Sequence, residues 1–383
     1  MIKQTFFFIL SFTFYHSFSQ PYTGSGSVTQ GLGIKTITNL YSACSNGRVS
    51  AVGTITSTDG KVWTLPAETN FLNAPKLPDL YNECTGVKPI NLAAVNLNNV
   101  PIKVIDNVGD TITAYLFGDN YFELYINGVL VGVDPITYTP FNSCVARFKV
   151  ARPYTIAVKL VDWEENMGVG TENNNGNLYH AGDGGFIAQF SDGTVTDTTW
   201  RAQTFYISPI ENLSSVIELP DSTRSTSSAS TSPSCNGNCY GIHYPISTNW
   251  TTQSFNDSIW PKATTYTAAT VGVNFPAYMN FTNAWSNAKF IWSSNLILDN
   301  VVLVRKTVPA TYTFTGNGNW DVPSNWVNYS VPPSILPAGK SISINPVKNG
   351  SCILNTTQQI NPGATISVSA DKTFLIPGNL IIQ

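Results

Sequence analysis

The feature that most constrains the fold is a strictly alternating stretch, FGDNYFELYINGVLVGVD, at residues 117–134. Its centre, Asn127-Gly128, suits a two-residue type I′ turn, because both residues tolerate positive φ angles. The stretch therefore predicts a β-hairpin. The turn would place the apolar side chains of one face opposite one another as Ile126–Val129, Leu124–Val131 and Phe122–Val133. We expect the other face to meet solvent or a ligand; it carries Tyr121, Glu123, Tyr125 and Asp134.

The composition extends this β character to the whole chain. Only 11% of the 383 residues are charged, 12% are aromatic, and no window shows a persuasive helical period. Short strands at regular spacing then predict an all-β fold, a β-sandwich of the jelly-roll kind. A net charge of −3 gives no electrostatic reason to expect nucleic acid or an anionic membrane as a partner.

The first residues predict export. The segment MIKQTFFFILSFTFYHSFSQ has an early lysine, an apolar run and small residues near Ser19, as in a secretory signal peptide covering residues 1–19. That run is too short to cross a bilayer, and no later segment is apolar enough, so we expect no transmembrane segment and a secreted, extracellular or cell-surface location.

The six cysteines fit this compartment. An even number of cysteines in an exported chain favours structural disulfides, although the sequence does not choose the pairing. Cys235 and Cys239, in CNGNC, are close enough along the chain to close a small loop. A metal site there lacks a second pair of ligands with matching spacing.

Changes in composition divide the mature chain. A β-sandwich is expected over residues 21–210, a Ser/Thr-rich linker or long loop over 211–239, and a second β segment over 240–307. Residues 308–383 contain short apolar groups, such as SISI, TISV and NLII, separated by Asn, Gly and Pro. This rhythm predicts a small C-terminal β module, either a short solenoid or a small sandwich.

Two motifs carry a resemblance to a known family. The stretch DNYFELYINGVLVG is similar to a hairpin of galactose-binding-like jelly rolls, and FNDSIWPKATTY followed by FIWSSN resembles another part of the same superfamily. The resemblance implies a carbohydrate-binding-module-like secreted protein. In that superfamily the FDDS-W stretch normally precedes the hairpin, whereas here it follows. The two segments are therefore either separate sandwiches or one jelly roll of permuted order, and we favour the second because residues 240–307 are few for an independent sandwich.

The C-terminal segment carries a second resemblance. The sequence FTGNGNWDVPSNWVNYSVPPSILPAG, with the GATISV and GNLIIQ that follow, resembles modules of secreted and surface proteins of Bacteroidetes-type bacteria. The resemblance implies a displayed or secreted protein and names no ligand.

The densest polar cluster lies in DWEENMGVGTENNNGNLYHAGDGG, residues 162–185, directly after an apolar strand. Such loops at a sandwich edge are common binding sites. Three interpretations stay open. The loop could hold calcium through Asp162, Glu164 and Asp183, contact a sugar through Trp163 and Tyr179, or be a solvated Gly/Asn-rich loop. Most tryptophans are expected in the core, and Trp163 is the one expected to be exposed.

The candidate ligand-binding residues follow from these features. The loop supplies the first set, Asp162, Trp163, Glu164, Glu165, Tyr179, His180 and Asp183. The hairpin supplies the second set, Asp119, Asn120 and Glu123.

Enzymatic motifs give little support for catalysis. The chain has no GxSxG elbow, HExxH motif, phosphate-binding loop or dinucleotide fingerprint. A glycosidase needs two carboxyl groups at a fixed separation, and Glu164 and Glu165 are the residues to test for that role. We therefore expect non-catalytic binding of a glycan or extracellular polymer, with structural calcium as the one cofactor considered. A polysaccharide-acting hydrolase and a structural adhesin or matrix component are the alternatives.

Overall fold

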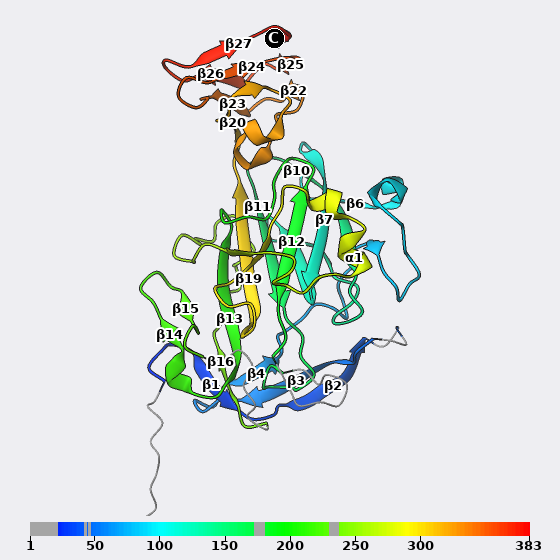
Figure 1. Ribbon diagram of the computed structural model, residues 1–383, viewed down its shortest axis with the longest axis vertical. Coiled ribbons are helices and arrows are strands. Elements are labelled where there is room, and N and C mark those ends of the chain that lie inside the picture. The colour runs from blue at the N-terminus through cyan, green and yellow to red at the C-terminus, as the bar shows by residue number, and fades with distance from the viewer. Residues whose placement is uncertain (1–21, 42–43, 45–46, 172–180, 230–236) are drawn as a thin grey trace, which may run out of the picture.

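The structure, a computed structural model, describes residues 22–41, 44, 47–171, 181–229 and 237–383. Its centre is a sandwich of two sheets, and a separate module lies at the C-terminal end (Figure 1). The first sheet has seven strands in the order β1 (Ser27–Gln30), β16 (Tyr240–His243), β13 (Arg201–Ile210), β19 (Asp299–Val308), β11 (Tyr154–Val161), β8 (Tyr121–Ile126) and β9 (Val129–Val133). Strand structure dominates, so the all-β prediction is confirmed.

The second sheet is also mostly antiparallel. Its order is β17 (Thr264–Tyr266), β18 (Phe290–Trp292), β12 (Gly185–Phe190), β7 (Asp110–Asp119), β10 (Ser143–Val150) and β5 (Asp79–Tyr81), and β6 (Ile102–Val104) adds to β10 in parallel. Helical structure in the described residues is limited to single turns: α1 (Pro276–Met279), η1 (Leu92–Ala94), η2 (Leu97–Asn99), η3 (Leu213–Ser215), η4 (Thr282–Trp285), η5 (Pro323–Asn325) and η6 (Val327–Tyr329).

The main core lies between the two sheets, where alternate residues of each strand meet. Phe122, Leu124 and Ile126 of β8 pack there with Ile156, Val158 and Leu160 of β11 and with residues of β7, β10 and β12. The predicted turn is confirmed, because Asn127 and Gly128 have φ angles of 51° and 85°.

The predicted pairing along the hairpin is only partly correct. Ile126 faces Val129, but the register shifts between Leu124 and Tyr125, so that Leu124 faces Gly132 and Glu123 faces Val133. This shift is a β-bulge, with one extra residue on β9. The alternation of apolar and polar residues in the sequence fits either register, so it does not reveal the bulge.

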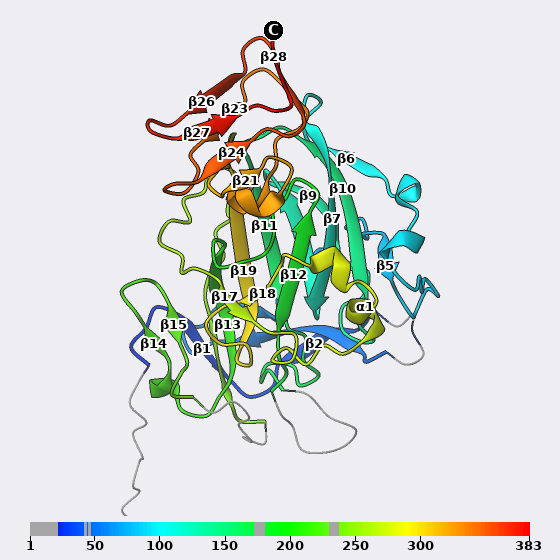
Figure 2. The same cartoon turned by 45° about the horizontal axis from the view of Figure 1, so that its top comes forward.

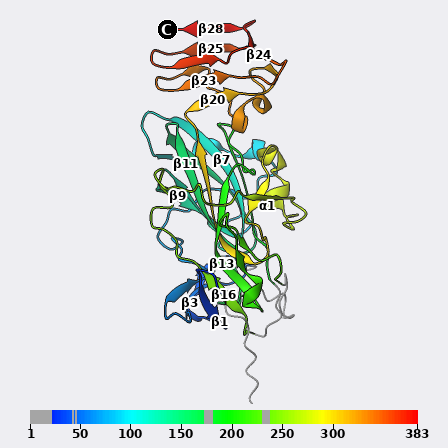
Figure 3. The same ribbon diagram turned by 90° about the vertical axis from the view of Figure 1, so that its left-hand side faces the viewer.

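Much of the outer face of the first sheet is also covered, which corrects the expectation that the whole face meets solvent or a ligand: Tyr121, Glu123 and Asp134 are buried, and Tyr125 is half-buried. A three-stranded N-terminal sheet, β2 (Ile34–Tyr41), β3 (Ser50–Thr56) and β4 (Val62–Leu65), lies at the end of the sandwich opposite the C-terminal module (Figures 1 and 3). It contributes to a second hydrophobic cluster with Tyr121, Ala157, Val161 and Trp163. Every residue of β11 is therefore buried.

Strands distant in sequence interleave within the sandwich. β19 pairs with β11 on one side and β13 on the other, while β16 joins β13 to β1. Residues 240–307 thus contribute strands to both sheets. The small hairpin β14 (Ile217–Glu218) and β15 (Arg224–Ser225) stands beside the first sheet.

The C-terminal module is a three-sided solenoid of parallel strands, which are visible as stacked rungs in Figure 3. Its sides are β20 (Thr311–Phe314), β23 (Ser341–Ile344) and β26 (Thr365–Val368); β21 (Gly318–Asn319), β24 (Ser351–Ile353) and β27 (Thr373–Leu375); and β22 (Ile335–Leu336), β25 (Thr357–Ile360) and β28 (Asn379–Ile382). Apolar side chains of successive rungs stack on one another, for example Ile342 on Ile366 and Cys352 on Phe374. The short apolar groups of the sequence are therefore solenoid rungs.

A buried arginine joins the solenoid to the sandwich. Arg152, which precedes β11, forms an ion pair with Asp192 at 2.6 Å, and its guanidinium lies 4.4 Å from the ring centre of Tyr312 in the first rung. It also donates to the hydroxyl of Ser330. Figure 2 shows the solenoid seated directly above β19 and β11.

The cysteines are used less uniformly than expected. Cys44 and Cys84 form a disulfide, and Cys239 is also disulfide-bonded, whereas Cys235 lies outside the described residues. Cys144 and Cys352 are free thiols buried in the sandwich core and the solenoid, so the expectation that all six form disulfides is wrong for these two. Within the described ranges no helix is long and apolar enough to cross a bilayer. The signal peptide expected at residues 1–19 lies outside them.

Candidate functional site

The loop that the sequence favoured is folded inward at its start. Asp162, Trp163 and Glu164 are all buried, and the Trp163 indole is 0% exposed, with its ring centre 6.0 Å from that of Tyr121. The backbone N–H of Trp163 donates to the side chain of Asn120. The expectation that Trp163 is an exposed platform is therefore wrong, because a third layer covers this face of the first sheet.

The carboxylates of this loop have protein partners. Glu164 accepts the backbone N–H of Gly182 at 2.9 Å, and the carboxylate of Asp162 lies beside the same glycine. Glu165 lies 3.6 Å from the guanidinium of Arg48, and Asp183 is half-buried. Among the described residues no three His, Cys, Asp or Glu side chains are grouped as metal ligands. Tyr179 and His180 lie outside the described residues, and calcium binding stays a prediction.

The second predicted set divides between the core and a pocket. Asp119 and Asn120 are buried where β7 leads into β8, and the Asn120 amide donates to the Asp119 carboxylate at 2.8 Å. Glu123 points to the outer face of the first sheet, where it lies in the wall of a pocket.

This aromatic pocket has a volume of about 520 Å³. Its floor is the outer face of the first sheet, with Tyr125 of β8, Lys159 of β11 and Phe205 of β13. Strand β4 and residues 66–70 form one wall, and residues 244–250 form another. With Val301 of β19, the pocket thus combines six parts of the chain that are far apart in sequence.

Aromatic side chains line much of the aromatic pocket. Trp63 is half-buried, and its indole stacks on the His243 imidazole with ring centres 5.1 Å apart and an interplanar angle of 20°. His243 stacks in turn on Tyr206 at 4.4 Å. Across the pocket, Tyr125 makes an edge contact with Trp250 at 5.6 Å. These contacts hold the rings in fixed positions.

Glu123 organises the polar side of this pocket, although it is 0% exposed. It accepts hydrogen bonds from the Asn70 backbone N–H at 2.7 Å, the Asn70 amide at 2.8 Å and the Tyr125 hydroxyl at 2.6 Å. The Tyr121 hydroxyl lies 3.1 Å away as a fourth donor. Glu123 therefore positions Tyr125 and Asn70, which reach the pocket, and does not itself meet a ligand.

Lys159 is the buried cation of the same network. Its ammonium donates to the backbone carbonyl of Glu68. Burial lowers the pKa of Lys159, while the carboxylates of Glu123 and Glu68 oppose that shift. For Glu123, burial acts to raise the pKa, but Lys159 and the hydrogen bonds from Tyr125 and Asn70 together hold it below its usual value. The carboxylate is thus ionised at neutral pH.

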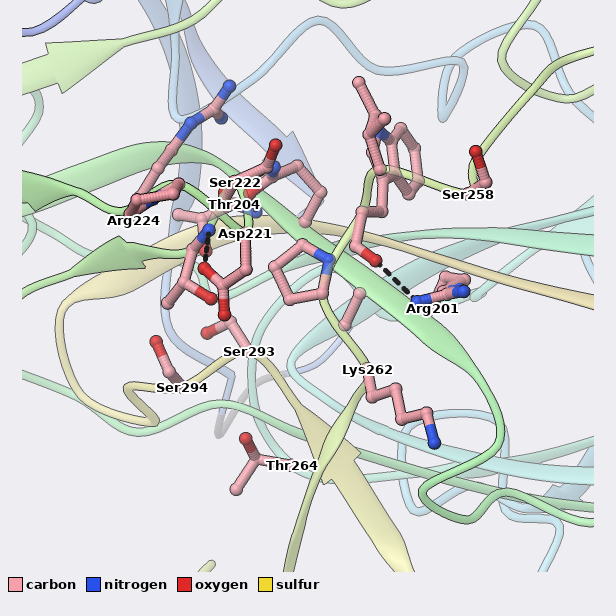
Figure 4. Close-up of a pocket in the computed structure, with 17 residues that line it drawn as sticks. Arg201, Thr204, Asp221, Ser222, Arg224, Ser258, Lys262, Thr264, Ser293 and Ser294 are labelled. Carbon is pink, nitrogen blue, oxygen red and sulfur yellow. Dashed lines mark hydrogen bonds between the residues drawn. The ribbon is translucent and has the colours of Figure 1, made fainter.

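Two further hollows adjoin the aromatic pocket and share lining residues with it or with each other. The aromatic pocket shares Phe205 and Ser247 with a connecting hollow of about 350 Å³. That hollow shares Gln203, Arg224 and Trp260 with a third hollow of about 590 Å³, the basic pocket, shown in Figure 4. We call the three together the groove. Its lining residues on the first sheet come from β8, β11, β19, β13 and β16.

The sequence contained partial signals of this site. The hairpin alternation placed Glu123 and Tyr125 on the outward face, and a lysine at position 159 interrupts an otherwise apolar strand. Trp63, Asn70 and Trp250 carried no such signal, because only the folding of β4 and of residues 244–250 against the first sheet brings them together. No family model, curated protein or solved structure matches the chain, so the galactose-binding-like and Bacteroidetes-type resemblances stay predictions.

Proposed function

We propose that this chain is an exported, non-catalytic protein that binds a glycan polymer in the groove. The observation that carries the proposal is the aromatic pocket, in which Trp63, Tyr125 and Trp250 stand beside the polar side chains of Asn70 and Glu68. Sugar rings have apolar C–H faces and hydroxyl edges, so they suit sites that pair an aromatic surface with a few fixed polar groups.

The fixed geometry of the pocket supports this proposal. Both the Tyr125 hydroxyl and the Asn70 amide are held by Glu123, and the Asn70 amide also donates to the Tyr125 oxygen at 2.9 Å. Groups held in place before binding lose little conformational entropy when a ligand arrives. The length of the groove, which extends beyond this pocket through the connecting hollow, suits a polymer better than a single sugar.

The hydrolase alternative has less support from the groove. A glycosidase needs one carboxyl group with a raised pKa to act as general acid. In the aromatic pocket the buried carboxyl, Glu123, has its pKa lowered. Glu164, one of the two residues expected in that role, is buried, does not line the groove and accepts a hydrogen bond from the backbone N–H of Gly182.

The test is binding of the mature chain to an array of soluble polysaccharides, followed by affinity electrophoresis of variants. We expect Trp63→Ala to weaken binding by about tenfold or more, as truncating a central aromatic contact commonly does. Phe275→Ala is the matched control, because Phe275 is 40% exposed and does not line the groove. Trp63→Phe, which keeps an aromatic ring, should fall between the two and guards against a folding defect.

The other outcomes are equally informative. Unchanged binding by Trp63→Ala would contradict the proposed site, and a chain that binds no polysaccharide saturably favours the structural adhesin. Release of reducing ends, abolished by Glu164→Gln or Glu165→Gln, favours the hydrolase. Repeating the binding measurement with EDTA tests for structural calcium. If calcium supports the site, its removal by EDTA should weaken glycan binding.

A further inference from the structure

The basic pocket has an unusual balance of charge. Three cations line it, Arg201, Arg224 and Lys262, against the single carboxylate of Asp221. Asp221 accepts the backbone N–H of Thr223 at 2.9 Å, and its carboxyl is fully exposed. In Figure 4 Arg201 and Lys262 lie on one side of the pocket and Arg224 on the other.

Two of these cations are direct neighbours across a β-bridge. Arg201, the first residue of β13, is paired antiparallel with Lys262, so both side chains leave the backbone on the same side. Like charges at directly opposed positions destabilise a sheet. Within the described ranges neither side chain has a carboxylate at ion-pairing distance.

The next cation in the same row is neutralised. Arg201 is also paired with Arg305 on β19, and Arg305 is buried with an ion pair of 2.8 Å to Asp257. The guanidinium of Arg201 donates a hydrogen bond to the backbone carbonyl of Trp260 at 2.9 Å. Among the residues that the structure describes, the buried member of the row has a carboxylate counter-ion and the two groove-lining members have none.

The third cation lies at the junction of the hollows. The guanidinium of Arg224 lies 3.4 Å from the ring centre of Tyr244 and 5.0 Å from that of Phe205. Phe205 and Tyr244 also line the aromatic pocket. Ser258, Thr264 and Ser294 also line the basic pocket. Arginine forks and hydroxyl groups are suited to the planar oxygens of carboxylates and to sulfate esters.

We propose that the glycan bound in the groove is polyanionic, with a carboxylate or sulfate group held between Arg201 and Lys262 in the basic pocket. This inference rests on the proposed function. It adds the class of ligand: the aromatic pocket takes a sugar face, and the basic pocket takes the charge of a unit further along the same polymer. An anion there would relieve the repulsion between the two paired cations.

The experiment measures the affinity of the full mature chain for three classes of polymer: neutral, carboxylated and sulfated. A neutral galactan, a polygalacturonate and a sulfated galactan represent these classes within a wider array. We expect a polyanionic polymer to bind more tightly than the neutral one, and its affinity to fall as salt is added. The double variant Arg201→Gln with Lys262→Gln should lower that affinity by about tenfold and leave neutral binding unchanged. Comparing the affinity for polygalacturonate with that for sulfated galactan shows whether the bound anionic group is a carboxylate or a sulfate.

Two controls keep the inference open to refutation. Lys88→Gln with Lys348→Gln removes the same charge from exposed positions outside the groove and should have little effect. Lys262→Glu changes one exposed side chain, so its effect does not depend on Arg201 packing, and it should weaken polyanion binding further than Lys262→Gln.

The outcomes separate the two proposals. Equal affinity for anionic and neutral polymers, or equal effects of the groove and control double variants, overturns the polyanion inference while groove binding still stands on Trp63. Binding to no polymer of any class overturns both.

Discussion

Replacing Arg152 by Met should detach the solenoid from the sandwich. The side chain of Arg152 is 3% exposed and that of its partner Asp192 is 7% exposed, so the ion pair is almost fully removed from water. Besides Asp192, Arg152 contacts the Tyr312 ring and donates to Ser330, both in the C-terminal module. The side chain thus links the two parts, together with the hydrogen bond from the Ser330 hydroxyl to the Asp192 carbonyl at 2.6 Å.

The expected cost follows from what the substitution leaves behind. Asp192 would remain buried as a carboxylate with hydrogen bonds from the Tyr154 hydroxyl at 2.7 Å and the Thr194 backbone N–H at 3.1 Å, and no cation. Removing one member of a buried ion pair commonly costs about 3 to 5 kcal/mol, whereas an exposed pair is worth under about 1 kcal/mol. Because two hydrogen bonds to Asp192 survive, we expect a loss near the lower figure, about 3 kcal/mol.

Urea unfolding followed by tryptophan fluorescence measures this loss, and limited proteolysis after Val308 reports the detachment. The double variant Arg152→Met with Asp192→Asn is the control, since it removes the stranded charge and should recover at least about 1 kcal/mol. A single-variant loss below about 1 kcal/mol would place Arg152 with ordinary surface ion pairs and refute the reasoning.

Three further predictions concern stability. Burial lowers the pKa of His243 to about 3, so between about pH 6.5 and pH 3 the unfolded chain binds a proton that the folded chain does not. The free energy of unfolding therefore falls as the pH falls through that range. In urea unfolding, His243→Phe should lose about 2 kcal/mol less stability than the parent on going from pH 7 to pH 4.5. Burial raises the pKa of Asp299 to about 7, so between about pH 4 and pH 7 the folded chain holds a proton that the unfolded chain has lost. The free energy of unfolding therefore falls as the pH rises through that range. By calorimetry, Asp299→Asn should be more stable than the parent at pH 9 and close to the parent at pH 5. The Cys44–Cys84 disulfide spans 40 residues, and replacing both cysteines by Ser should cost about 4 kcal/mol by the loop-entropy relation; an unchanged melting temperature would contradict that value.

Local chemistry was sufficient to predict the β character of this chain and some of its strands. Asn127-Gly128 specifies its turn through backbone angles, and the alternating residues of β8 specify which side enters the core. β3 and β4 likewise consist largely of β-branched and apolar residues and pair as an antiparallel ladder. The short apolar groups after residue 308 predicted rungs for a similar reason, since stacking requires like side chains at equivalent positions.

The candidate site could not be predicted from the sequence, because its residues lie on different sheets that come together only when the chain folds. The loop after β11 looked exposed, since nothing in its own sequence shows that a further sheet packs over Trp163. For the same reason Trp63 could not be matched with Tyr125, which lies on a different sheet and about 60 residues away in the chain. Glu123 was selected correctly as a polar group on the outer face, but its four hydrogen bonds make it a support for the pocket.

The order of strands in the first sheet has a consequence for how the sandwich comes apart. In the first sheet β19 lies between β11 and β13, and β1 pairs with β16. In the second sheet β17 and β18 lie beside β12. Both sheets therefore contain strands from before and after the Ser/Thr-rich stretch. A backbone cut after Glu218 would leave two fragments, each missing the neighbours of its own central strands. The fragments should therefore stay associated after cleavage and unfold in one step, and each should be able to rebuild the sandwich only by re-pairing with the other.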